Sequence, residues 1–93
     1  MGVLWEVFMS NHMRVTPARR DFLRLVNQPD FRIRITDKRF FEYRASGQIK
    51  RRISARNFMN MRAAGWIYLF GNPDPCGFVK AGVRAALKEN YQI

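Results

Sequence analysis

A stretch in the middle of the chain, from Arg51 to Phe70, has the apolar spacing of a helix followed by a strand. Its apolar residues recur at every third position and share one helical face: Ala55, Phe58 and Met61. Small, amide and guanidinium groups lie mostly away from that face: Arg56, Asn57, Asn60 and Ala63. We therefore predict an amphipathic helix with an apolar underside and an exposed polar side.

Suitable residues stand at both ends of this helix. Ser54 can accept hydrogen bonds from the first free backbone N–H groups. Gly65 suits the left-handed C′ position that ends a helix, and Trp66 can close over the last turn. The apolar run WIYLF that follows predicts a short strand, so that the helix at 54–64 leads directly into it.

An earlier helix is predicted from Thr16 as N-cap and Pro17 at the first helical position. It would run to about Asn27 and end at Gln28-Pro29-Asp30. Its expected buried stripe consists of Phe22, Leu25 and Val26, with Ala18 one turn earlier. The residues expected on or near its other side are Arg19, Arg20 and Arg24.

The segment between the two helices alternates in the manner of strands. In FRIRI the apolar residues Phe31, Ile33 and Ile35 fall on one face. After a turn at 36–38, the runs RFFEYR and QIKRRI predict a hairpin closed by a turn that contains Gly47. The alternative is a short helix over 37–45, which would supply the second helix of a helix-turn-helix. Adjacent aromatic residues favour the strand.

Turn and strand signals continue after the central helix. The run GNPDP predicts a turn, Gly77–Lys80 a returning strand, and about Ala81–Asn90 a final helix. The inward-facing residues of that helix would be Val83, Ala86 and Leu87. Residues 1–13 show no clear periodicity, and we expect a flexible N-terminal segment there, followed by a single domain over 14–93.

Charge adds a functional expectation to this pattern. The 93 residues include 17 Lys and Arg against 7 Asp and Glu, which gives a formal charge of +10. Such an excess points to a polyanion, with nucleic acid ahead of an anionic membrane surface. A protein partner for a generally basic chain remains the alternative. Most of the cations are arginines, whose planar fork suits phosphates and base edges.

Other chemistry finds little support in the sequence. A single cysteine, Cys76, and a single histidine, His12, are too few for a disulfide or a typical zinc site. No glycine-rich phosphate loop or paired-carboxylate motif is present. We therefore expect no enzymatic activity, no cofactor and no metal. No apolar run approaches the length of a membrane span, and we expect a cytoplasmic protein in which Cys76 is a partly buried structural thiol.

The order of the predicted elements resembles that of winged helix-turn-helix domains. In these domains one helix enters the major groove and the hairpin after it, the wing, lies along the backbone or the minor groove. SARNFMNMRAAGWIYL resembles a recognition helix and first wing strand, GNPDPC a wing tip, and FVKAGVRAALKEN a closing strand and helix. The closing strand commonly runs into Thr with Gly soon after, where this chain has Lys80 and Val83. The resemblance implies an α+β, winged helix-turn-helix-like domain with three helices and β-hairpins.

A narrower resemblance covers residues 42–67. The run EYRASGQIKRRISARNFMNMRAAGWI is similar in spacing to the bacterial YjhX family, which is associated with inhibiting topoisomerase I as a toxin. The matching positions are Tyr43, Gly47, Phe58 and Ile67, with apolar residues at Ile53, Ala55 and Met61. These residues maintain a fold, so they imply a shared architecture more than a shared activity.

Together these observations predict a DNA-binding protein, of the kind of a small bacterial or phage-type transcription regulator. Duplex DNA would be bound by the helix at 54–64 and a wing at 70–78. The candidate phosphate contacts are Lys50, Arg51 and Arg52. The candidates for base edges are Arg56, Asn57 and Asn60, while Arg62 could reach the backbone or stay solvated.

Two other functions stay open from the sequence. The chain could be a protein-binding inhibitor of a nucleic-acid enzyme such as a topoisomerase. It could also bind RNA or single strands, which would require Phe41 and Tyr43 to be exposed. No long coiled-coil heptad is present to pair two copies, so the pattern leaves both a monomer and a dimer open.

Overall fold

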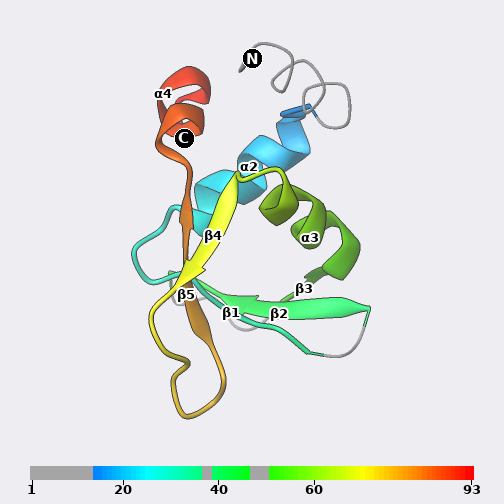
Figure 1. The fold of residues 1–93 in the computed structure, drawn as a ribbon, viewed down its shortest axis with the longest axis vertical. Helices are drawn as coiled ribbons and strands as arrows, with labels where there is room; N and C mark the ends of the chain where they lie inside the picture. Colours follow the sequence, from blue (N-terminus) through cyan, green and yellow to red (C-terminus); the bar gives the residue numbers. More distant parts are fainter. Residues whose placement is uncertain (1–13, 37–38, 47–50) are drawn as a thin grey trace.

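The computed structural model describes residues 14–36, 39–46 and 51–93, with only the backbone at Arg51. Within these residues the chain forms three helices and a five-stranded antiparallel sheet (Figure 1). In chain order the elements are α2 (Pro17–Val26), β1 (Arg32–Arg34), β2 (Phe40–Arg44), β3 (Arg51–Ser54), α3 (Ala55–Ala63), β4 (Ile67–Phe70), β5 (Val79–Val83) and α4 (Ala85–Tyr91). The predicted α+β class, with three helices and β-hairpins, is confirmed.

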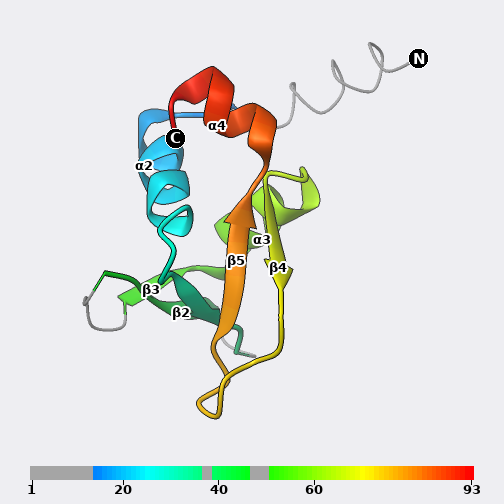
Figure 2. The same cartoon turned by 90° about the vertical axis from the view of Figure 1, so that its left-hand side faces the viewer.

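The sheet has the strand order β3-β2-β1-β5-β4, and all neighbouring pairs are antiparallel. Ile33 of β1 lies opposite Tyr43 on one side and Val79 on the other, so β1 joins two ribbons. In Figures 1 and 2 the β1–β2–β3 ribbon and the β4–β5 hairpin are steeply inclined to each other. Helices α2 and α3 lie on the side that the two ribbons enclose.

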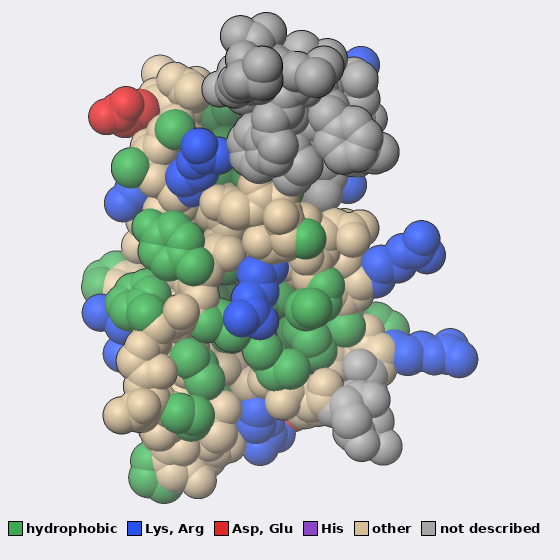
Figure 3. All heavy atoms as spheres, in the orientation of Figure 1, with side chains coloured by type: hydrophobic (Ala, Val, Ile, Leu, Met, Phe, Trp, Pro, Cys, Tyr) green, Lys and Arg blue, Asp and Glu red, His purple; other side chains and the backbone are tan. Residues whose placement is uncertain are grey.

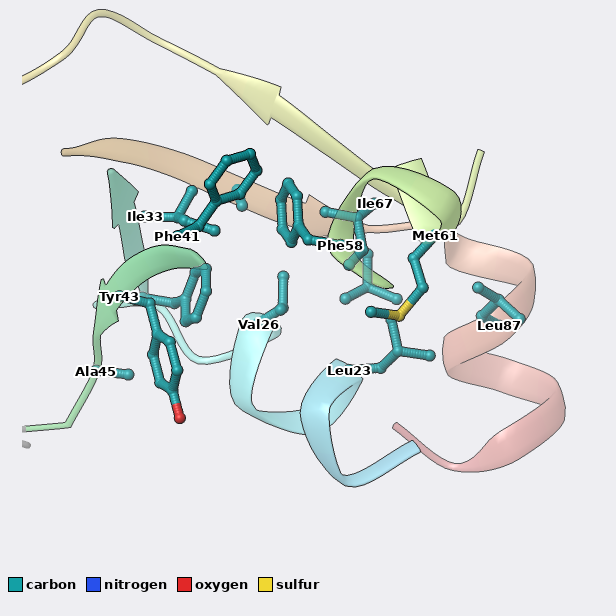
Figure 4. Close-up of a cluster of buried hydrophobic side chains, with 13 residues drawn as sticks. Leu23, Val26, Ile33, Phe41, Tyr43, Ala45, Phe58, Met61, Ile67 and Leu87 are labelled. Carbon is teal, nitrogen blue, oxygen red and sulfur yellow. The ribbon is translucent and has the colours of Figure 1, made fainter. Parts of the chain in front are cut away.

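A single apolar core fills the space between the helices and the inner side of the sheet (Figure 4). It is supplied by Leu23, Val26, Phe31, Ile33, Phe41, Tyr43, Ala45, Phe58, Met61, Ile67, Ala81, Val83 and Leu87. Phe58 of α3 makes edge-to-face contacts with Phe41 of β2 and Phe22 of α2, at centroid distances of 5.7 and 6.4 Å. Helix α3 is thus anchored from both sides by aromatic packing.

Helix α2 begins and ends as predicted, but its buried side differs in part. The Thr16 hydroxyl accepts a hydrogen bond from the Arg19 N–H at 3.2 Å, and the helix ends at Val26. Leu23 is fully buried although the expected stripe omitted it, and Ala18 is exposed. The reason is that α2 packs on β5 through its second half, which leaves its first turn at the surface.

The segment that follows forms strands, and the alternative helix over 37–45 is wrong. Phe40–Arg44 pairs with both β1 and β3 as a strand. Residues 37–38 and Gly47, assigned to the two turns, lie outside the described residues. Ile35 is exposed rather than buried, because β1 ends at Arg34 and the chain then turns away from the core.

The C-terminal boundary also differs from expectation. Strand β5 continues to Val83, where the sequence predicted a helix from Ala81. Val83 is paired with Ile67 of β4, and the N–H of Arg84 donates to the Trp66 carbonyl at 2.8 Å. This pairing holds the backbone extended until Arg84, so Val83 is buried from the strand and Ala86 of α4 is exposed.

Candidate nucleic-acid interface

Both ends of α3 are held by local hydrogen bonds of the predicted kind. The Ser54 hydroxyl accepts from the Asn57 N–H at 3.3 Å. At the other end, Gly65 has a φ of +78°, its N–H donates to the Arg62 carbonyl, and the Trp66 N–H donates to the Met61 carbonyl. These two bonds form a Schellman motif, which satisfies carbonyls that the helix end would leave free. The predicted cap and stop are confirmed.

The exposed side of α3 carries Arg56, Met59, Asn60 and Ala63, while Phe58 and Met61 are buried beneath it. Because successive residues are about 100° apart around the axis, those exposed residues cover the side opposite the core. Asn57 and Arg62 are also exposed, but on opposite flanks. The three candidates for base edges are therefore at the surface, with Arg56 and Asn60 one turn apart at the centre.

Asn57 faces a hollow between α2 and α3. This cavity has a volume of about 260 Å³ and an apolar floor that includes Phe22, Phe58 and Met61. The amide of Asn57 is thus at the rim of the exposed α3 side, and Arg62 is at the other rim. If the exposed side of α3 faced a groove of a nucleic acid, side chains at these two rims would be nearer the walls of that groove than its floor.

The described side chain of the basic run at 50–52, that of Arg52, does not extend the exposed side of α3. Arg52 is exposed, but it lies opposite Glu42, whose neighbours Phe41 and Tyr43 point into the core. Strand alternation therefore places Arg52 on the face of the sheet turned away from α3. Lys50 and the side chain of Arg51 lie outside the described residues.

Several arginines on that outer face are already engaged within the protein. Arg34 pairs with Glu42, and Arg44 pairs with Asp74. Their guanidinium carbons lie 5.3 and 4.4 Å from the ring centre of Phe78, which is 1% exposed. Phe78 thus forms a small packed cluster outside the main core, covered by the stems and heads of two paired arginines.

The cations of α3 have no such compensation. The helix contains no acidic residue, and neither Arg56 nor Arg62 has a salt bridge among the described residues. Figure 3 shows Lys and Arg side chains spread over the visible face, some of them projecting at the edge where α3 and the β2–β3 hairpin lie. Uncompensated charge together with amide groups gives α3 the chemistry of an anion-contacting helix.

The loop proposed as a wing tip has a firmly held shape. The Asp74 carboxylate accepts the N–H groups of Cys76 and Phe78, both at 2.9 Å, and pairs with Arg44. In Figures 1 and 2 this β4–β5 loop extends past one side of the β1–β2–β3 ribbon, whereas α3 lies on the other side. Cys76 is exposed, which corrects the expectation of a partly buried thiol, because only its backbone is held by Asp74.

Asp74 gives the folded state a pH dependence. The N–H of Phe78, then that of Cys76 and the Arg44 guanidinium, hold the pKa of this carboxyl below its ordinary value, against the effect of partial burial. Its contribution to stability is present above the unfolded pKa of about 3.9 and is lost as pH falls through the lower folded pKa. Thermal melts should show Asp74→Asn less stable than wild type at about pH 6, with the gap closing as the pH falls below the unfolded pKa and through the lower folded pKa.

The control for this measurement is Asp21→Asn, because Asp21 is exposed and reaches Arg24 only at 4.0 Å. That variant should follow the wild-type curve throughout. A gap for Asp74→Asn that stays constant down to the acid end would contradict the assigned role of the carboxylate.

Exposed aromatic residues are the main feature of the surface that the sequence interpretation missed. Phe41 and Tyr43 are buried, with only 4% and 6% of their surface exposed. This burial removes the basis given for single-strand binding through them. Tyr68 and Phe70, in contrast, are 49% and 41% exposed on β4. The alternation of Ile67 and Leu69 with Tyr68 and Phe70 was the signal that could have found them.

Two further observations bound the chemistry of the described residues. They contain no group of three or more His, Cys, Asp and Glu side chains that could hold a metal ion. Among them, too, no helix is both long enough and apolar enough to cross a membrane.

Comparison of the chain with protein-family models, with curated proteins and with solved structures finds no match. The chemistry of the protein's own surfaces is therefore what indicates a function.

Proposed function

We propose that this protein binds duplex DNA without catalysing a reaction, and that it acts as a transcription regulator of bacterial or phage type. In this proposal α3 enters the major groove, as the recognition helix does in helix-turn-helix proteins. The observation that carries it is the exposed, acid-free side of α3, on which Arg56 and Asn60 stand one turn apart. Among the described residues, no salt bridge competes for the charge of Arg56.

The residues on this side of α3 fit the edges of base pairs. Arginine can donate two hydrogen bonds to guanine, and asparagine can pair with adenine in the same bidentate manner. Met59 and Ala63 lie beside Arg56 and Asn60 on the same exposed side and offer apolar contact to a thymine methyl group. Asn57 and Arg62, on the flanks, are placed to reach phosphates, which set position rather than specificity.

The winged-helix arrangement belongs to this proposal with one change. The β2–β3 hairpin occupies the place in the chain where the alternative helix over 37–45 would have supplied the second helix of a helix-turn-helix. The loop at 71–78 carries the Asp74–Arg44 pair and extends on the other side of the ribbon from α3. We therefore assign DNA contact mainly to α3 and give this loop a smaller part than the sequence suggested.

Salt dependence tests whether binding is electrostatic. In an anisotropy titration with a duplex of about 20 base pairs, the affinity should fall with a log–log slope of about −0.9 per phosphate neutralised. With about four phosphates contacted, raising the salt from about 50 to about 200 mM weakens binding roughly 100-fold. If no duplex binding occurs at the lower salt, the proposal fails, and a protein partner such as a nucleic-acid enzyme takes its place.

Substitutions on α3 test base reading. On a duplex selected from a random pool, Arg56→Ala and Asn60→Ala should each cost about 1–3 kcal/mol of binding free energy and relax the sequence preference. Lys88→Ala, an exposed cation on α4, is the matched control and should weaken all sequences slightly and equally. Equal, sequence-independent losses for all three variants would reject base reading by α3.

A further inference from the structure

Tyr68 and Phe70 form an exposed aromatic pair on the face of β4 opposite to Ile67 and Leu69, which pack against the core. Their ring centres are 6.2 Å apart and the rings are inclined at 47°, so neither ring covers the other by stacking. Figure 2 looks at this side of the molecule, and no helix that it draws crosses in front of β4 and β5. Side chains of this size at the surface of a small sheet give up the stabilisation that burial would provide, which raises the question of what they contact.

Both rings are held in place by the strand beneath them. Gly82 lies opposite Tyr68 in the β4–β5 pairing, and a Cβ there would come within 2.9 Å of Phe70 Cε1 and 3.0 Å of Tyr68 Cε2. The rings therefore occupy the space that a side chain at position 82 would need. The Tyr68 hydroxyl also donates to the Val83 carbonyl at 3.3 Å, which fixes the orientation of this ring.

Three cations lie in the same row of the sheet as Phe70. The strand register aligns Arg44, Arg32, Lys80 and Phe70 in one row across four strands. Like charges directly opposite each other destabilise a sheet. Arg32 donates to the carbonyls of Pro29 and Phe31, and these contacts do not neutralise its charge. Among the residues that the structure describes, Arg44 is the one member of this row with a salt bridge, to Asp74.

A shallow hollow lies beside the two rings. It has a volume of about 210 Å³ and is lined by Tyr68, Phe70, Lys80, Gly82 and Lys88, together with the end of α2 and the turn that follows it. No acidic residue lines it. A planar group that stacks on either ring would thus lie beside a hollow that two lysines line.

We propose that this face binds unpaired bases of single-stranded nucleic acid. Every base has a π-face that stacks on an aromatic ring, and the phosphates between bases attract lysine and arginine. The Lys80 ammonium lies 5.2 Å from the centre of the Phe70 ring. Such an exposed cation–π contact is weak, so a base can take its place while the ammonium moves to a phosphate. The site is separate from α3 and does not depend on the proposed binding of duplex DNA.

Anisotropy titrations of the full chain with single strands test the proposal. The probes are oligo(dT) and oligo(U) of about 20 nucleotides, and an abasic DNA strand of the same length and charge. Both base-bearing strands should bind about 10-fold more tightly than the abasic strand, because only they can stack. The double variant Tyr68→Leu/Phe70→Leu should lose this preference while its binding of the abasic strand stays nearly unchanged. If wild type binds abasic and base-bearing strands equally, stacking is excluded and the proposal is overturned.

Matched variants separate this site from others. Phe40→Leu removes an aromatic side chain of similar exposure, 45%, from the other ribbon and should leave the preference intact. Gly82→Ala should reduce it by displacing the rings, and a far-ultraviolet circular dichroism spectrum like that of wild type shows that the chain still folds. Loss of the preference in Phe40→Leu but not in the double variant would reject the assigned site.

Two further measurements distinguish the remaining outcomes. Arg56→Ala should weaken duplex binding and preserve the preference for base-bearing single strands, so the two proposals can fail independently. A decaproline peptide tests the other ligand that aromatic surfaces commonly take. If the peptide binds in a Tyr68- and Phe70-dependent way and the single strands do not, the face serves a protein partner and the proposal is overturned.

Discussion

Phe58→Ala should lower the free energy of unfolding by about 3–5 kcal/mol, the usual cost of removing a buried phenylalanine ring. Phe58 is fully buried, and its ring contacts Phe22 and Phe41 edge to face. The substitution therefore removes contacts from α2 and β2 together and leaves a cavity where α3 meets both. In a domain of this size such a loss is a large part of the total stability.

Urea denaturation followed by circular dichroism measures this loss. The matched control is Met59→Ala, because Met59 is the next residue of the same helix and is 46% exposed. Its cost should stay below about 1 kcal/mol, since surface substitutions in a helix have small effects. Similar midpoints for the two variants would contradict the assignment of the buried and exposed sides of α3, on which the proposed DNA contact depends.

Phe78→Ala should cost about 3 kcal/mol, near the lower end of the range for a buried phenylalanine. Phe78 is 1% exposed but lies outside the main core, between the guanidinium groups of Arg34 and Arg44. The two arginine stems can move toward the vacated space, which reduces the cavity that remains. The loop that Asp74 organises should loosen at the same time, because the lost ring no longer fixes the position of residue 78, whose backbone N–H donates to Asp74.

Denaturation is again the measurement, with Phe70→Ala as the control on the same hairpin, since Phe70 is 41% exposed. The control should cost clearly less than Phe78→Ala. Duplex binding below the unfolding transition should be unchanged in Phe78→Ala, because α3 is anchored in the other cluster. If Phe78→Ala is as harmless as Phe70→Ala, the small outer cluster does not stabilise the fold.

The ends of α2 and the two ends of α3 were predictable because they depend on a few neighbouring residues. Thr16 and Ser54 cap the helices with their own hydroxyls, and Gly65 adopts a positive φ that suits glycine. The choice of strand over helix at 40–44 followed from adjacent aromatic residues. The end of β5 was not predictable in this way, because Ala81 and Val83 stay extended only through pairing with β4.

For the candidate sites, too, some features were predictable from local sequence and others were not. The sequence by itself determined which residues of α3 are buried and which are exposed, because an amphipathic helix sets its faces by spacing alone. Only the tertiary structure decided that Arg52 lies on the far side of the sheet, that Phe78 is covered by two paired arginines, and that Phe70 lies in one row with Lys80 and Arg32. These properties arise from strand register and from contacts between segments distant along the chain. Neither can be inferred from local periodicity.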